Sequence, residues 1–332
     1  MTANPSVTFV CCVESGGLEA QTVRMVESLR RWGGKLANAP IIAVTPRFGP
    51  PLAHRTLKAF EKLHVKYICS YPKSRYSWFK FLNKPYALVT AEEHITSDSI
   101  CWLDSDLLIL GEPDKLILND GEDFLGCASD KEMGTSGPGD AFEPLWRKNC
   151  ETLGINIEDL PWLLTEQEGK YIRLYWNGGI FVYRRSTSFA HHYLQTCIQL
   201  LDARTITNTP GFSLGINEMS AIGLAMVKMG VSWRALPFSH DYIMSSKTHD
   251  QWYKEEQLKA ARIIHYHDSM WPHFWSVFIG CLHDTHPFVA DWLSSVGPMK
   301  NEAPFYYRGL SKILQRLRAK QESVYKKLCR VI

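Results

Sequence analysis

Apolar runs alternate with helical patterns along the first part of the chain, and this alternation constrains the fold more than any other feature. Residues 7–13 form a continuous apolar run, and residues 18–32 then carry apolar side chains at helical spacing. A second apolar run at 40–44 precedes a second helical pattern at 52–63, and a third run covers 65–68. Strands that alternate with helices pair in parallel. The sequence therefore predicts an α/β fold with a mixed, mostly parallel sheet flanked by helices.

The charged residues are unevenly distributed. The chain has 37 basic and 34 acidic residues, a net charge of +3. Eight Lys or Arg but only one acid lie between Phe305 and Ile332, so the rest of the chain is net acidic. Hydrophobic residues make up 45% of the chain, which excludes a disordered or fibrous protein. We expect no nucleic-acid partner, because a net charge of +3 is too small to suggest one.

The terminal segment has the pattern of a basic amphipathic helix. Lys and Arg alternate there with apolar residues three and four positions apart, namely Leu310, Ile313, Leu314, Leu317, Val324, Leu328 and Val331. Such a helix binds an anionic membrane, or packs on the body of the protein or on a partner subunit. Both alternatives stay open. We expect one domain at 1–300 followed by this basic tail at 301–332.

Cysteine usage and hydropathy suggest a location in the cell. The nine cysteines are scattered and odd in number, without a Cys-x-x-Cys pair, which argues against a disulfide framework or a zinc ribbon. The N-terminus lacks a basic segment followed by a long apolar stretch, and nowhere do about 18 apolar residues run together. We expect a cytoplasmic protein, with peripheral contact to the inner face of a membrane through the tail.

Two aspartates follow an apolar strand predicted at 99–103. Asp104 and Asp106 are separated by Ser105 and have apolar residues on both sides. Residues two apart in an extended segment point the same way, so both carboxylates face one pocket while Ser105 turns aside. Parallel sheets bind ligands beyond the carboxyl ends of their strands. Two carboxylates there favour a hard divalent cation; a solvated pair in a turn is the alternative.

Two later segments also carry residue types suited to a site. His265 and His267 lie two apart at the end of a short predicted strand, so both imidazoles face one target, either a metal or hydrogen-bonding groups of the core. Asn177 can both donate and accept hydrogen bonds. Gly178 and Gly179 follow it and let the backbone approach a ligand closely, although an ordinary turn into a strand is equally compatible with them.

The three segments, in this order along the chain, resemble a known family. An apolar strand ending in Asp-x-Asp, an Asn-Gly-Gly strand and a late strand ending in hydrophobic-His-aromatic are similar to the metal-dependent nucleotide-sugar glycosyltransferases of the GT-A fold. The closest resemblance is to glycosyltransferase family 8, which contains glycogenin and bacterial lipopolysaccharide galactosyltransferases. It spans about residues 7–271. It implies a Rossmann-like nucleotide-binding half at 1–110 and an acceptor half at 111–300.

The resemblance also implies roles for individual residues. Asp104, Asp106 and His265 match the metal ligands of the family, for Mn²⁺ or Mg²⁺, and His267 then lies beside the site. Lys84 matches a lysine that reaches the donor. The remaining donor-binding residues are expected in the loop after the first strand and near the two later motifs: Val13, Glu14, Ser15, Ser105, Gly178 and Gly179.

The activity implied by the resemblance is transfer of a sugar from a nucleoside-diphosphate sugar, with a UDP-sugar as the expected donor. The acceptor is a hydroxyl of a carbohydrate, a lipid or another molecule. Retention of the anomeric configuration is expected because family 8 retains. Glu218, Asp130 and Asn177 are the expected catalytic residues, and Asp268 is a further candidate on the acceptor side.

The sequence departs from the family at two places. The family's Asp-Gln pair at the helix after the Asn-Gly-Gly strand is replaced by Asn217-Glu218. The glycine and lysine that serve the diphosphate in the family's last motif are absent after His265. Two other functions stay open, a metal-dependent hydrolase that uses the Asp and His cluster and a non-catalytic sugar-binding module.

Overall fold

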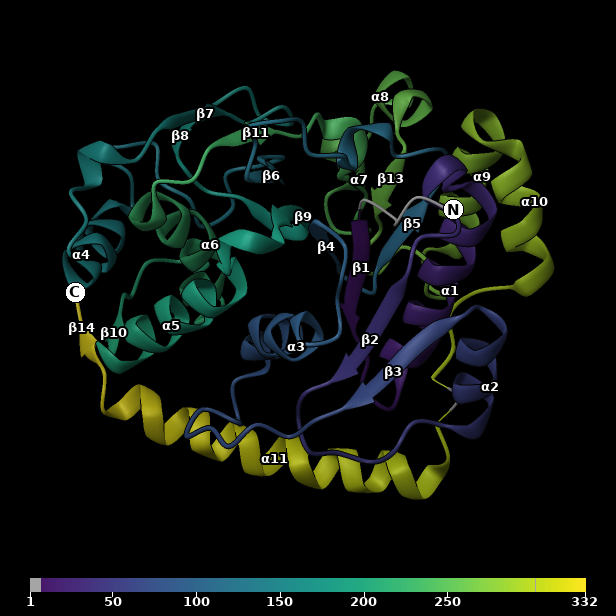
Figure 1. The fold of residues 1–332 in the computed structure, drawn as a ribbon, viewed down its shortest axis with the longest axis horizontal. Coiled ribbons are helices and arrows are strands. Elements are labelled where there is room, and N and C mark those ends of the chain that lie inside the picture. Colours follow the sequence, from purple (N-terminus) through teal and green to yellow (C-terminus); the bar gives the residue numbers. More distant parts are fainter. Residues whose placement is uncertain (1–6, 302) are drawn as a thin grey trace.

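A seven-stranded sheet forms the centre of the molecule in the computed structural model, which describes residues 7–301 and 303–332 (Figure 1). In spatial order its strands are β11 (Trp233–Ala235), β6 (Phe124–Cys127), β9 (Asn177–Arg184), β4 (Ser99–Leu103), β1 (Val7–Cys12), β2 (Ile41–Thr45) and β3 (Val65–Cys69). β9 runs antiparallel to both of its neighbours, and the other neighbouring strands pair in parallel. The predicted mixed, mostly parallel sheet is confirmed.

Helices cover both faces of this sheet. They are α1 (Gly17–Trp32), α2 (His54–Lys62), α3 (Asn83–Glu92), α4 (Glu143–Leu153), α5 (Phe189–Asp202) and α6 (Ile216–Met229). Side chains of β1 alternate between the faces, as strand geometry requires. Phe9 and Cys11 belong to the core beneath α1 and α2, whereas Val10 belongs to the core shared with α3, α5 and α6.

A smaller sheet brings the late histidines beside the aspartate pair. Its order is β12 (Tyr242–Ile243), β13 (Ile263–His265) and β5 (Leu107–Ile109). β13 is antiparallel to β5, with His265 opposite Leu107. The other side of this sheet packs into a third core with α8 (Glu255–Ala260), α9 (Trp275–Thr285) and α10 (Pro287–Val296). Asp106 and His265 therefore become neighbours although they are far apart in sequence.

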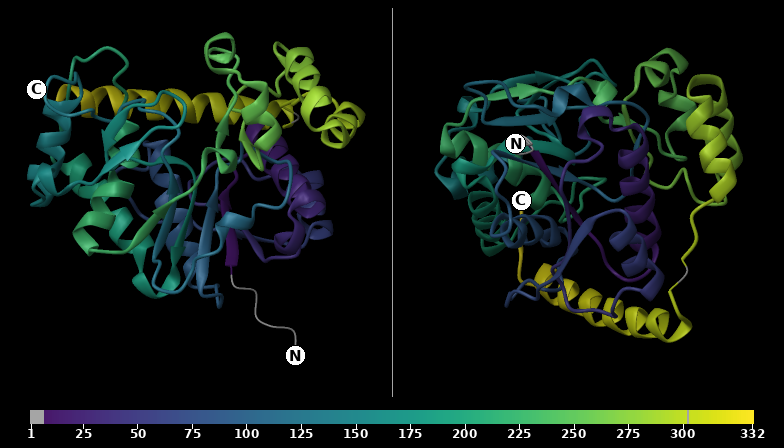
Figure 2. Two further views of the ribbon diagram at one scale, coloured as in Figure 1. Left: turned by 90° about the horizontal axis from the view of Figure 1, so that it is seen from above. Right: turned by 45° about the vertical axis from the view of Figure 1, so that its right-hand side comes forward.

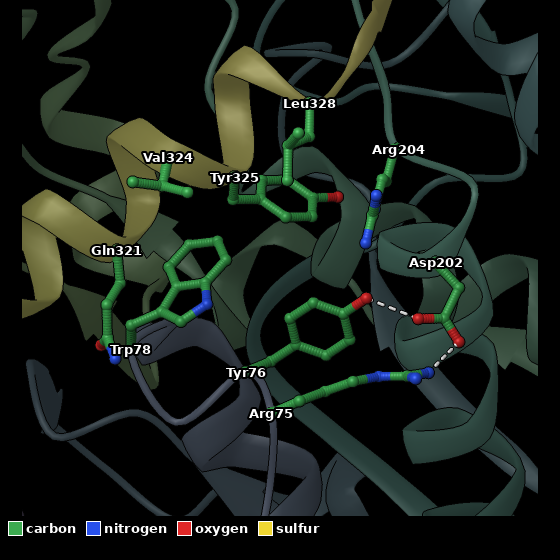
Figure 3. Close-up of a pocket in the computed structure, with 9 residues that line it drawn as sticks. All are labelled: Arg75, Tyr76, Trp78, Asp202, Arg204, Gln321, Val324, Tyr325 and Leu328. Carbon is green, nitrogen blue, oxygen red and sulfur yellow. Dashed lines mark hydrogen bonds and ion pairs between the residues drawn. The ribbon is translucent and has the colours of Figure 1, made fainter.

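The predicted terminal helix is present as α11 (Phe305–Lys327), which runs along the outside of the molecule (Figures 1 and 2). Figure 3 shows how its C-terminal end meets the body: Tyr325 faces Trp78, with 5.1 Å between the ring centroids. The Tyr325 hydroxyl donates a hydrogen bond to the carbonyl of Leu201. Beyond the helix, β14 (Arg330–Val331) pairs in parallel with β10 (Thr205–Ile206).

The remaining described elements are short. β7 (Trp162–Leu164) pairs with β8 (Tyr171–Arg173), and α7 (His249–Trp252) follows β12. Strands from both sides of residue 110 belong to the large sheet, so the expected nucleotide and acceptor halves share it. The first six residues of the expected domain and residue 302 of the expected tail lie outside the described residues. None of the described helices has both the length and the apolar character needed to cross a bilayer.

Candidate active site

A cavity of about 990 Å³ opens where the carboxyl ends of β1 and β4 meet the start of β9 and the end of β13. This volume suits a ligand of nucleotide-sugar size. Most of the residues singled out from the sequence line it, namely Glu14, Lys84, Asp104, Ser105, Asp106, Asp130, Asn177, Gly178, Gly179, Glu218, His265, His267 and Asp268. The three motif segments thus meet in one place.

Asp106, His265 and His267 offer ligand atoms that all lie within 4.8 Å of one another. His265 Nε2 lies 3.3 Å from Asp106 Oδ1, and His267 Nδ1 lies 3.9 Å from Asp106 Oδ2. Among the described residues this group does not include Asp104, which was expected to be a ligand. Instead, Asp104 Oδ1 accepts a hydrogen bond of 2.7 Å from the indole of Trp102. His267, expected beside the metal, lies within the cluster.

The three side chains of this cluster differ in charge. Burial lowers the pKa of His267 to about 4, so its imidazole is neutral at physiological pH and has a free lone pair. Burial also disfavours the charge on His265, but the carboxylates of Asp106 and Asp241 together outweigh burial and raise its pKa well above the ordinary value. His267 has a left-handed backbone (φ 49°), a strained conformation often found at functional sites. One carboxylate and two imidazoles are ligand types that hold a divalent transition-metal ion.

Lys84 is the positive charge at the floor of the cavity. Its Nζ donates a 2.7 Å hydrogen bond to the carbonyl of Gly178 and lies 3.6 Å from Asp104 Oδ1. On its other side, Glu218 Oε1 is 3.2 Å away. Burial alone would lower the pKa of Lys84, but Asp104 and Glu218 raise it, so the amine stays charged. Glu218 is only 1% exposed and also accepts a hydrogen bond from the Tyr193 hydroxyl.

The two glycines of the Asn-Gly-Gly motif make room for side chains of the site. A β-carbon on Gly178 would lie 2.6 Å from Lys84 Nζ, and one on Gly179 would lie 2.6 Å from His265 Nδ1. The carbonyl of Gly179 also accepts a hydrogen bond of 2.8 Å from the backbone of Asp104. The sequence suggested that these glycines let backbone approach a ligand. In the structure, the absence of a side chain at these two glycines lets Lys84 and His265 approach the backbone.

Asp130 and Glu132 form an acidic part of the cavity lining. Asn177 donates a 3.1 Å hydrogen bond to Asp130 Oδ1, and its own oxygen accepts one of 2.6 Å from the backbone of Ser129. Burial, reinforced by the nearby charge of Glu132, raises the pKa of Asp130 to about 7. Glu132 accepts a hydrogen bond from the Tyr175 hydroxyl. The sequence did not indicate Glu132, because nothing local places its side chain in the cavity.

Glu14 also lines the cavity, and its carboxylate is held by hydrogen bonds. Arg47 donates two hydrogen bonds to its carboxylate, of 2.8 and 2.7 Å, and Asn83 donates a third of 3.1 Å. Arg47 follows β2 at the same edge of the sheet, a position from which the sequence could have indicated it. Val13 and Ser15 were expected to line this site, but neither belongs to the cavity lining. Val13 follows β1 and is fully buried, and its backbone N–H donates a hydrogen bond of 3.0 Å to the carbonyl of Val44.

Comparison with known proteins places the chain in a family. Residues 9–210, more than half of the chain, match the sequence profile of the Rhodobacterales glycosyltransferase domain. No curated protein matches the chain. The solved apo structure of the bifunctional glycosyltransferase WbbM is similar, with a TM-score of 0.52 and 12% identity over 86% of this chain and 51% of that one.

Two further solved structures are more distant. The apo form of the glycosyltransferase GlyE from Streptococcus pneumoniae TIGR4 has a TM-score of 0.48 and 15% identity, over 90% of this chain and 66% of that one. The galactosyltransferase LgtC in complex with donor and acceptor sugar analogs has a TM-score of 0.46 and 11% identity, over 91% and 99%. The chain spans about half the length of WbbM.

The expected fold and enzyme class are both confirmed. The sheet and its flanking helices form a GT-A fold, and the likeness to WbbM agrees with this architecture. The family match covers the aspartate pair and the Asn-Gly-Gly strand, which contribute to the cavity. The chain belongs to the Rhodobacterales glycosyltransferase domain family and is a glycosyltransferase enzyme.

Proposed function

We propose that the enzyme transfers a sugar from a UDP-sugar to an acceptor hydroxyl in a reaction that depends on Mn²⁺. The proposal rests mainly on the convergence of Asp106, His265 and His267 in the cavity that also holds Lys84. A cation held there would supply Lewis-acid stabilisation of the charge that develops on the departing diphosphate. The two imidazoles favour Mn²⁺ over Mg²⁺, which prefers oxygen ligands.

The protein's own cations support the departing phosphate. Lys84 is charged, fixed by three oxygen contacts and directed into the cavity floor. Lys247, in the loop before α7, lines the same cavity and offers a second positive charge where the family's late lysine is missing. Arg47 and Asn83 hold the carboxylate of Glu14 in the cavity lining. This carboxylate provides hydrogen-bond acceptors for a nucleoside.

On the acceptor side, we assign different roles to the three residues expected to be catalytic. Asp130 accepts a hydrogen bond from the acceptor hydroxyl, and Asn177 holds Asp130 in place. Glu218, nearly fully buried beneath Lys84, balances the charge of that lysine. We propose retention on the basis of the family 8 resemblance, with the departing phosphate taking the hydroxyl proton. The anomeric configuration of the product, read by NMR, tests this outcome.

A donor screen tests the proposed reaction. Nucleotide sugars are added one at a time to the protein in the presence of Mn²⁺, and the unfolding temperature is measured. One UDP-sugar should raise the unfolding temperature, because a ligand that binds only the folded state stabilises it by mass action. The same sugar nucleotide should give no shift in the presence of a chelator. A shift with another base, or an equal shift with chelator, would contradict the proposed donor or the metal requirement.

We also propose that α11 lies on an anionic bilayer. Residues three and four positions apart lie on the same face of a helix, and three groups of residues can be distinguished on α11 in this way. One face, marked by the buried Tyr325, packs on the body. The next carries apolar side chains that are each between 39% and 57% exposed: Tyr306, Leu310, Ile313, Leu317 and Val324. The third carries basic residues: Arg308, Lys312, Arg316, Lys320, Lys326 and Lys327. An apolar stripe beside a basic face is complementary to anionic lipid.

Vesicle sedimentation tests this contact. The protein should bind vesicles that contain phosphatidylglycerol and bind pure phosphatidylcholine vesicles much less. Replacing Ile313 and Leu317 together by Gln should reduce the bound fraction several-fold, whereas Ser323→Gln on the basic face should not. Equal binding to both vesicle types would contradict the proposal. A second contradictory outcome is a wild-type protein that does not bind vesicles but self-associates, and that loses self-association when Ile313 and Leu317 are replaced. This outcome would assign the apolar stripe to contact with a second copy of the chain.

A further inference from the structure

Asp241 is an enclosed carboxyl group that the sequence did not indicate. It immediately precedes β12 and is 0% exposed. Its Oδ2 accepts a hydrogen bond of 3.3 Å from the Ser129 hydroxyl. Its Oδ1 lies 3.3 Å from Nδ1 of His265. Among the described residues, His265 is the basic side chain that forms an ion pair with Asp241. Because a carboxyl group without partners is costly to bury, this contact must offset part of that cost.

The imidazole of His265 stands between two carboxyl groups. Its Nδ1 faces the enclosed Asp241, and its Nε2 faces Asp106 at 3.3 Å, inside the cavity. Gly179 closes a third side, since a β-carbon there would lie 2.6 Å from the ring and 3.4 Å from Asp241 Oδ1. A ring held in this way has one orientation, with Nε2 toward the cluster. In metal sites, the group bonded to one imidazole nitrogen fixes the other as the ligand.

We propose that Asp241 is the positioning residue of the metal site. It holds Nδ1 of His265 and thereby directs Nε2 toward the cation, while it contacts neither the cation nor the substrate. The inference rests on the proposed metal site and goes beyond it, because it assigns cation affinity to a residue outside the cavity lining. It predicts that Asp241 affects Mn²⁺ binding only through His265.

Mn²⁺ affinity, measured from the electron paramagnetic resonance signal of unbound Mn²⁺, tests this role without any turnover. Asp241→Asn should weaken binding by about 10- to 100-fold. The double variant with His265→Gln should bind no more weakly than His265→Gln alone, because both changes remove the same interaction. Glu143→Gln is the matched control, since Glu143 is also a buried carboxyl group but is bonded to Thr135 in another part of the fold. It should leave the affinity unchanged.

The outcomes separate this inference from the metal site itself. If Asp241→Asn binds Mn²⁺ like the wild type while His265→Gln does not, the positioning role is overturned. An additional loss in the double variant would also overturn it. If the wild type binds no Mn²⁺, or His265→Gln binds normally, the proposed metal site fails instead. Should Asp241→Asn not fold, Ser129→Ala removes the hydrogen bond to Oδ2 of Asp241 and should lower the affinity several-fold; unchanged affinity would count against the inference.

Discussion

Gly179 lies against the imidazole of His265 so closely that a β-carbon would come within 2.6 Å of Nδ1. Gly179→Ala should therefore displace the ring from the cluster and weaken Mn²⁺ binding by about 10-fold or more. Titration calorimetry with Mn²⁺ measures this change. Gly280→Ala is the control, because a β-carbon at that helical position meets nothing within 4 Å. Unchanged affinity in Gly179→Ala would show that the ring position does not determine binding.

Lys84 and Glu218 form a buried ion pair. Substitutions in this pair can separate its contribution to the free energy of unfolding from its contribution to transfer activity. Lys84→Met leaves the Glu218 carboxylate enclosed without its cation, so the free energy of unfolding should fall by about 3 kcal/mol. Adding Glu218→Gln should restore most of this loss, because the unpaired charge is then gone. Transfer activity should stay about 10²-fold low in both variants, since both lack the cation that faces the diphosphate. Denaturant titration and initial rates provide the two measurements.

If activity recovered together with stability in the double variant, Lys84 would be a structural residue only. A stability loss that persisted in the double variant would show that Glu218 is not what the lysine neutralises. Glu143→Gln again serves as a control for removal of a buried carboxyl group elsewhere.

Asp130 should set the acidic limit of the pH profile. Its pKa is raised to about 7 by burial and then by Glu132, so below this pH its carboxyl group is protonated and accepts a hydrogen bond poorly. The ratio kcat/KM should therefore fall as the pH decreases through 7. Glu132→Gln removes the like charge and should move this limit to lower pH.

Asp268→Asn is the control for the pH profile. Asp268 also lines the cavity, but its pKa is lowered to about 2, because hydrogen bonds from Ser246 and His273 outweigh the effect of burial. Its replacement should leave the acidic limit near pH 7. A limit that stays in place in Glu132→Gln, or one that moves in Asp268→Asn, would exclude Asp130 as the titrating group.

Much of the fold could be predicted because its strands and helices have strong local patterns. Most strands of the large sheet are apolar runs, and α1 and α5 each bury one side. β5 was not predicted, since its three residues become a strand only through pairing with β13. The short helices α9 and α10 were also missed. They are separated only by His286, and Pro287 opens the second, so neither forms a long uninterrupted pattern.

The site was predicted at the level of segments rather than side-chain directions. Strand ends meet at one edge of a sheet, which is why Asp106 and His265 could be expected together. The turn of Asp104 toward Trp102 depends on a side-chain hydrogen bond across two residues. The inclusion of His267 depends on a left-handed backbone, which is uncommon for residues other than glycine and was not indicated by the local sequence. Asp241 lies in a segment with no motif, so only the fold shows its contact with His265.

Binding of UDP, measured by calorimetry with Mn²⁺ and with chelator, tests the central claim most directly. The account predicts measurable binding with Mn²⁺, none with chelator, and a loss of about 10²-fold in affinity for Asp106→Ala and for His265→Ala. Equal UDP binding with chelator, or Asp106→Ala and His265→Ala proteins that bind UDP and Mn²⁺ like the wild type, would contradict it.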